Sequence, residues 1–149
     1  MDAVTYPTQD VIEHIEKYSI PVRIPFDAPL AREFVVKWTP NLLFVDAERA
    51  LHHRIIGFLP PEELNPAILL GVGKVFFDHG DFDRALGTLN EVLEKHPGSH
   101  AAPEAVYFRG VSLYKQTHSG EPLKNAYEKL KAAYPESEWT KRAAPYRLL

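Results

Sequence analysis

The side chains of this sequence that could do acid–base or metal chemistry are histidines and carboxylates, because the chain contains no cysteine. The missing sulfur excludes disulfides, thiolate nucleophiles, redox pairs and cysteine-based zinc sites. The motifs G-x-S-x-G, P-loop and H-E-x-x-H are also absent. We therefore predict a protein that is not an enzyme, with no catalytic residues and no cofactor.

The histidines do not form a metal-binding pattern in the sequence. His52 and His53 are adjacent in a predicted strand, where neighbouring side chains point to opposite faces and cannot converge on one ion. The other histidines are scattered over predicted helix surfaces and turns, where we expect solvated side chains: His14, His79, His96, His100 and His118. The sequence therefore predicts no metal site.

Two groups of carboxylates could act as acid–base pairs if one member were desolvated. They are Glu62 with Glu63, and Asp78 with Asp81 and Asp83. The glutamates lie at a predicted helix start, where negative charge is stabilised, and the aspartates lie in a predicted turn. We expect structural roles for both groups.

Composition and charge narrow the class of protein. The 149 residues are 45% hydrophobic, enough for a folded core. The 17 basic and 20 acidic side chains leave no basic footprint for nucleic acid. The first residues lack the pattern of a signal peptide, and no apolar run approaches the roughly 18 residues of a membrane span. We expect a cytoplasmic protein without nucleic-acid or membrane partners.

Apolar periodicity predicts the elements up to residue 64. A helix is expected over 9–18, with Thr8 as its N-cap, and the alternation of Ile20, Val22 and Ile24 predicts a short strand interrupted by prolines. A helical turn follows within 28–36. The run NLLFVD, 41–46, is typical of a strand buried on both faces, ALHHRIIGF, 50–58, of a second strand, and LPPEEL of a helix start.

The sequence after residue 64 resembles tetratricopeptide repeats. In 69–97 nine residues occupy the large, small and breaker positions of that pattern: Leu69, Val72, Gly73, Phe76, Gly80, Ala85, Leu89, Val92 and Pro97. A second copy over 105–135 keeps Gly110, Tyr127 and Pro135 but has a longer predicted turn at QTHSGEP. A final helix over 139–146 would cover the last apolar face.

The resemblance to tetratricopeptide repeats implies a concave face that binds a protein or peptide partner. In this register the face would comprise Leu70, Lys74, Phe77, Tyr107, Val111, Tyr114 and Lys115. Two lysines among aromatic and aliphatic side chains suit a peptide with an acidic group or a free carboxylate. Alternatively, the same side chains pack against the amino-terminal half or against a second protomer.

Residues 1–65 resemble the carboxy-terminal part of a thioredoxin-like domain. Thr39 and Pro40 match the cis-proline segment of that family, NLLFVD and ALHHRIIGF its last two strands, and PPEEL the start of its last helix. The resemblance implies that the redox cysteines and the central strand would lie before Met1. Without that strand the sheet would have unpaired backbone groups that must be covered.

We therefore predict an α+β fold: a partial thioredoxin-like α/β/α segment over 1–65, followed by an all-α tetratricopeptide array over 66–149. The expected function is a redox-inactive interaction or scaffold module, homodimeric because a second copy can replace the missing strand. A partner that supplies this strand by β-augmentation is another possibility. The alternative is a truncated thiol-disulfide oxidoreductase whose W-C-x-x-C motif lies upstream of Met1.

Overall fold

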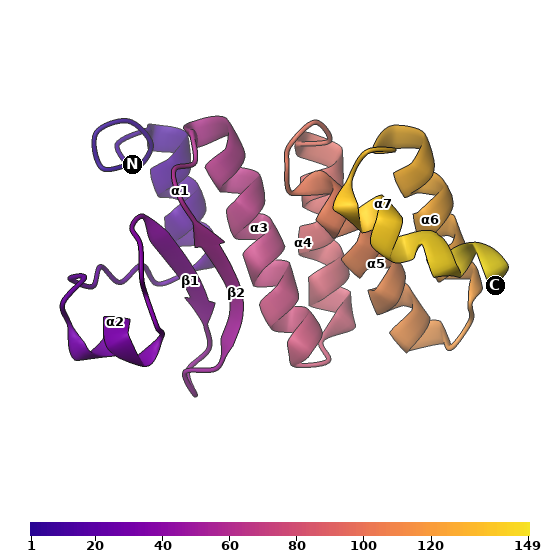
Figure 1. Cartoon of the computed structure of the whole chain (residues 1–149), viewed down its shortest axis with the longest axis horizontal. Helices are drawn as coiled ribbons and strands as arrows, with labels where there is room; N and C mark the ends of the chain where they lie inside the picture. The colour runs from indigo at the N-terminus through magenta and orange to yellow at the C-terminus, as the bar shows by residue number, and fades with distance from the viewer.

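Helix α3 (Pro61–Asp78) lies at the centre of the molecule and is buried around its whole circumference over its middle turns. Every residue from Leu64 to Gly73 is buried, as expected for a helix that is apolar on all sides. The computed structural model describes all 149 residues and places α3 between a small sheet and a set of helices (Figure 1).

The fold is α+β, mostly helical with one two-stranded antiparallel sheet. The remaining elements, in chain order, are α1 (Gln9–Tyr18), α2 (Pro29–Glu33), β1 (Asn41–Val45), β2 (Leu51–Ile56), α4 (Phe82–Lys95), α5 (Ala102–Thr117), α6 (Glu121–Ala133), α7 (Glu138–Ala143) and a 3-10 helix (Ala144–Leu148). The predicted helices over 9–18 and 28–36, and both predicted strands after residue 40, are confirmed. No helix is both long and apolar enough to cross a membrane.

One side of α3 packs against α1 and the hairpin. Val11 of α1 joins Leu64, Ile68 and Val72 of α3 in a buried cluster, which the β1 residues Leu42 and Phe44 cover. The Phe44 ring lies directly on Gly71, where an added Cβ would approach ring atoms to 2.5 Å. A glycine is therefore needed at this point for the sheet to approach the helix.

The other side of α3 packs against α4 and α5. Leu69 and Leu70 join Leu89 and Val92 of α4 and the start of α5 in a second buried cluster. The predicted domain boundary between residues 65 and 66 therefore falls inside α3, and the two halves of the chain share this helix.

The strand predicted from the alternation of Ile20, Val22 and Ile24 does not form. Pro21 and Pro25 lack backbone donors, and no other strand lies beside this segment to pair with it. Its apolar side chains consequently point into solvent, Ile20 with 91% of its surface exposed.

The strand prediction for 41–46 was right in position but wrong in burial. β1 is half-buried, because it has a single neighbour, β2, with Leu42 opposite Ile55 and Phe44 opposite His53. On the far face of the sheet, the Arg54 guanidinium donates hydrogen bonds to the carbonyl groups of Phe34 and Val35. These hydrogen bonds hold the segment that follows α2 against that face of the sheet.

Helices α3 to α6 form two hairpins, and in each of them a glycine of the first helix faces the second helix. Gly73 packs against Thr88 and Leu89, and Gly110 packs against Ala126; Leu89 and Ala126 each lie sixteen positions after the glycine. The predicted longer turn in the second hairpin is wrong: residues 118–120 form a turn as short as residues 79–81. Helix α5 instead continues further past Gly110, to Thr117, than α3 does past Gly73, to Asp78.

We predict that Gly110→Ala destabilises the fold by about 1–3 kcal/mol, because the new methyl group would lie 2.5 Å from the Ala126 Cβ and force α5 and α6 apart. The matched control is Gly87→Ala, in α4, where nothing lies within 4 Å of an added Cβ. This control should stabilise the protein by about 0.5–1 kcal/mol through helix propensity. Urea unfolding measures both, and equal effects would contradict the close approach of α5 and α6.

Candidate functional site

The residues predicted to line a concave face are mostly engaged inside the molecule. Leu70 is buried in the cluster between α3, α4 and α5. Phe77 meets the rings of Phe82 and Phe108 edge-on. These two side chains therefore belong to the helix packing and are not available to a ligand.

Lys74 is held by an ion pair between α3 and α5. Its Nζ lies 2.7 Å from Glu104 Oε1, and the two side chains are only 17% and 14% exposed. Nζ also lies 3.0 Å from His53 Nδ1 and above the Phe108 ring. Burial and the Lys74 charge lower the pKa of His53 to about 4, so the neutral ring accepts a hydrogen bond from Lys74. The Lys74 charge is thus satisfied within the chain.

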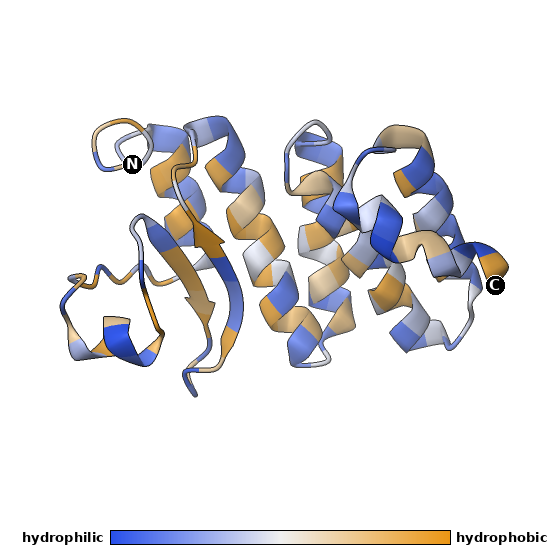
Figure 2. Cartoon of the chain, in the orientation of Figure 1, coloured by the Kyte–Doolittle hydropathy of each residue, from blue (hydrophilic) through white to orange (hydrophobic).

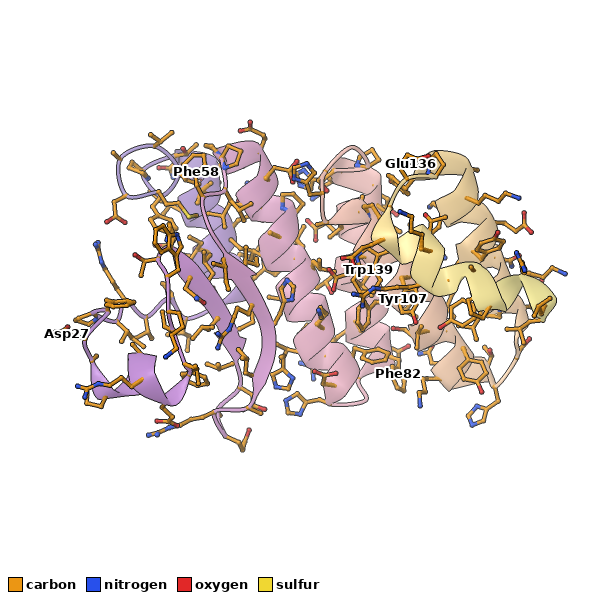
Figure 3. All side chains as sticks on the ribbon, in the orientation of Figure 1. Asp27, Phe58, Phe82, Tyr107, Glu136 and Trp139 are labelled. Carbon is orange, nitrogen blue, oxygen red and sulfur yellow. The ribbon has the colours of Figure 1, made fainter.

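Tyr107 is covered by the carboxy-terminal segment. Its ring packs against Trp139 of α7 and stacks on Tyr146, as Figure 3 shows for Tyr107 and Trp139. The Tyr107 and Tyr146 hydroxyl groups are hydrogen-bonded at 2.8 Å. Of the predicted concave face, Val111 is half-buried, and only Tyr114 and Lys115 are exposed.

The predicted cis-proline segment lies at the surface, just before β1. The peptide bond between Thr39 and Pro40 is cis. Thr39 lines a shallow hollow together with Phe26, Lys37 and Trp38. This hollow is open to solvent, and its lining contains no carboxylate or histidine beside Lys37 and Thr39.

Most of the large apolar side chains that are exposed lie in the amino-terminal half. They are Val4, Ile20, Val22, Ile24, Phe26, Val35, Trp38, Val45, Leu51, Ile56 and Phe58; in the helical half only Tyr114, Leu148 and Leu149 are exposed in this way. Figure 2 shows apolar positions along β1 and in the segment between α1 and α2. A concentration of this kind is typical of an interaction surface.

The outer edge of β1 has no backbone partner. Gly57 N–H donates to Pro40 C=O, so Leu42 and Phe44 form the hydrogen-bonded pairs with β2, and the N–H and C=O of Leu43 point to the outer edge. No hydrogen bond joins Leu43 to any segment outside the sheet. We call this edge, together with Trp38, Val45 and Ile56, the β1 surface.

A second group of side chains lies where the hairpin turn meets the end of α3. His52 Nε2 is 2.9 Å from Asp46 Oδ2, and His52 Nδ1 is 2.7 Å from Asp78 Oδ2. His79 Nε2 lies 3.2 Å from the same Asp46 oxygen. The side chains of His52 and Asp46 are only 8% and 10% exposed. We call these four residues the His52 cluster.

The charged forms of His52 and Asp46 stabilise each other. Burial opposes charge on the His52 ring, but hydrogen bonds to Asp78 and Asp46 outweigh it and raise the pKa of His52. The hydrogen bond from His52 lowers the pKa of Asp46, and the Ala50 N–H contributes in the same direction. The side chains of His52 and His53 diverge as predicted. His79 is exposed to solvent as expected, but it also lies beside Asp46.

The sequence contained little signal for this cluster. Asp46 and His52 are separated from Asp78 and His79 by more than twenty residues, and they meet only because the end of α3 packs beside the hairpin turn. The three atoms Asp46 Oδ2, His52 Nε2 and His79 Nε2 lie within 4.8 Å of one another and could hold a metal ion.

Comparisons of the chain with models of protein families, with curated proteins and with solved structures found no match.

We predict that Glu104→Gln lowers the free energy of unfolding by about 1–3 kcal/mol, because it leaves the half-buried Lys74 charge unpaired. The control is Glu138→Gln, whose ion pair with Arg142 is exposed and should be worth less than about 1 kcal/mol. Both effects can be measured by urea unfolding. An unchanged stability of Glu104→Gln would show that Lys74 does not depend on Glu104.

Proposed function

We propose that this chain is a non-catalytic protein-interaction module that associates with a second copy of itself through the β1 surface. The observation that carries the proposal is the two-stranded sheet with an unpaired outer edge among exposed apolar side chains. Isolated two-stranded sheets are marginal, and an unpaired strand edge is a ready template for another strand. A second copy of the chain would extend the sheet beyond two strands and would pair the free edge of β1.

The residues of β1 favour a symmetric contact. The strand, NLLFV, carries no charged side chain, so two copies can meet without repulsion between like charges. An antiparallel pairing about a two-fold axis would place Leu43 of one copy opposite Leu43 of the other. The two hairpins would then form one four-stranded sheet.

The outer edge of β2 is less suited to such a contact. β2 carries His52, His53 and Arg54, and the hydrogen bonds of these side chains are made within the chain. A two-fold contact through this strand would bring positively charged side chains close together. The proposal therefore assigns self-association to β1.

The helical half offers little exposed surface to a partner. Of the predicted peptide-binding face, Tyr114 and Lys115 are exposed, and two side chains offer too little surface for a peptide partner. Lys74 would have to give up Glu104 in order to bind an acidic group. Self-association is therefore the function that the geometry supports better.

Two features favour the family resemblances that we propose for the two halves. The order of two antiparallel strands followed by a helix agrees with a redox-inactive, partial thioredoxin-like segment. The equal spacing of the glycine contacts in the two helical hairpins agrees with tetratricopeptide-like repeats. A comparison of the backbone course with both families would test these relationships.

We predict that the wild-type chain sediments at twice its 16.9 kDa mass and that Trp38→Glu weakens this association at least about tenfold. The Trp38 side chain is 69% exposed beside β1, so a carboxylate there should oppose the contact without affecting the folded monomer. Sedimentation equilibrium over a concentration series measures the association constant.

The matched control is Leu148→Glu, because Leu148 is 80% exposed but lies at the far end of the molecule. It should associate like the wild-type chain. A wild-type chain that stays monomeric, or two variants that behave alike, would contradict self-association through the β1 surface.

A further inference from the structure

The His52 cluster combines ionisable side chains from the hairpin and from the end of α3. Asp46 and His52 lie at the turn of the hairpin, and Asp78 and His79 lie at the carboxy-terminal end of α3. Imidazole and carboxylate groups that converge in this way are a common set of ligands for divalent transition metals.

The distances in the cluster suit a tetrahedral ion. With bonds of roughly 2.0–2.1 Å, the ligand atoms of tetrahedral zinc lie about 3.3 Å apart. Asp46 Oδ2 lies 2.9 Å from His52 Nε2 and 3.2 Å from His79 Nε2. An ion could therefore bind with small movements of these three side chains.

Two ligands are already oriented by groups behind them. Asp46 Oδ1 accepts a hydrogen bond of 2.8 Å from the Ala50 N–H, which leaves Oδ2 directed at the imidazoles. His52 Nδ1 lies 2.7 Å from Asp78, so that the other ring nitrogen faces Asp46. A carboxylate behind a histidine ligand is the usual arrangement in zinc sites, since it fixes the ring and its tautomer.

The local electrostatics also favour a cation. The two carboxylates carry two negative charges, and a divalent ion that displaces the proton of His52 Nε2 would balance both of them. The cluster lies at the carboxy-terminal end of α3, where the helix dipole is negative.

We infer that Asp46, His52 and His79 form a binding site for a zinc-class divalent ion, with Asp78 as the residue that positions His52. Three protein ligands leave a fourth position, on the side of the half-exposed His79, for water. The ion would tie the hairpin turn to the end of α3. This inference is independent of self-association, because all four residues belong to one chain.

The test is isothermal titration of the full chain with zinc chloride, followed by thermal unfolding with and without zinc. We expect saturable binding of one ion per chain and a higher midpoint of thermal unfolding with zinc. His79→Gln should weaken binding at least about tenfold and remove the shift in the midpoint. Asp78→Asn should weaken binding by about 10–100-fold, as is typical for the partner of a histidine ligand.

The matched control is His100→Gln, which removes an exposed histidine outside the cluster and should bind zinc like the wild-type chain. His79 is half-exposed, so its replacement should leave the fold intact, and the circular dichroism spectrum without zinc checks this. The inference is overturned if the wild-type chain shows no saturable binding, or if His79→Gln and His100→Gln bind zinc equally well. In either case the cluster would serve only as an ion-pair network.

Discussion

The structure depends on the burial of α3 from all sides. Leu64 and Leu69 are fully buried on opposite sides of this helix, and each such side chain contributes about 1.5–3 kcal/mol through removal from water. A helix of this kind needs cover on every face. The sheet and α1 cover one side while α4 and α5 cover the other, so the two halves of the chain are expected to fold as one unit.

This arrangement leaves the two halves with different surfaces. In the helical half, charged and aromatic side chains such as Lys74 and Tyr107 have partners within the chain. In the amino-terminal half, α3 supplies the core for a sheet of only two strands, and apolar side chains such as Trp38 and Ile20 are left in contact with water. This difference is why the proposed interaction surface lies beside β1 and not on the helices.

The helices and the hairpin could be predicted from the sequence, because apolar periodicity and prolines are local signals. The alternation of Ile20, Val22 and Ile24 was misleading, since a strand also needs a neighbour and none is present. The burial of Leu70 and the ion pair of Lys74 depend on how α3 meets α5. The contact between Asp46 and His79 likewise depends on tertiary packing, which the spacing of histidines along the chain does not encode.

The central claim is that the outer edge of β1 pairs with a second copy of the chain, and the amide of Leu43 reports on it directly. Amide hydrogen exchange of Leu43 should slow as the protein concentration rises through the association range, because its N–H gains a partner. The Leu42 amide is already paired with β2 and should change less. Exchange of the Leu43 amide at one rate over the whole concentration series would contradict the account.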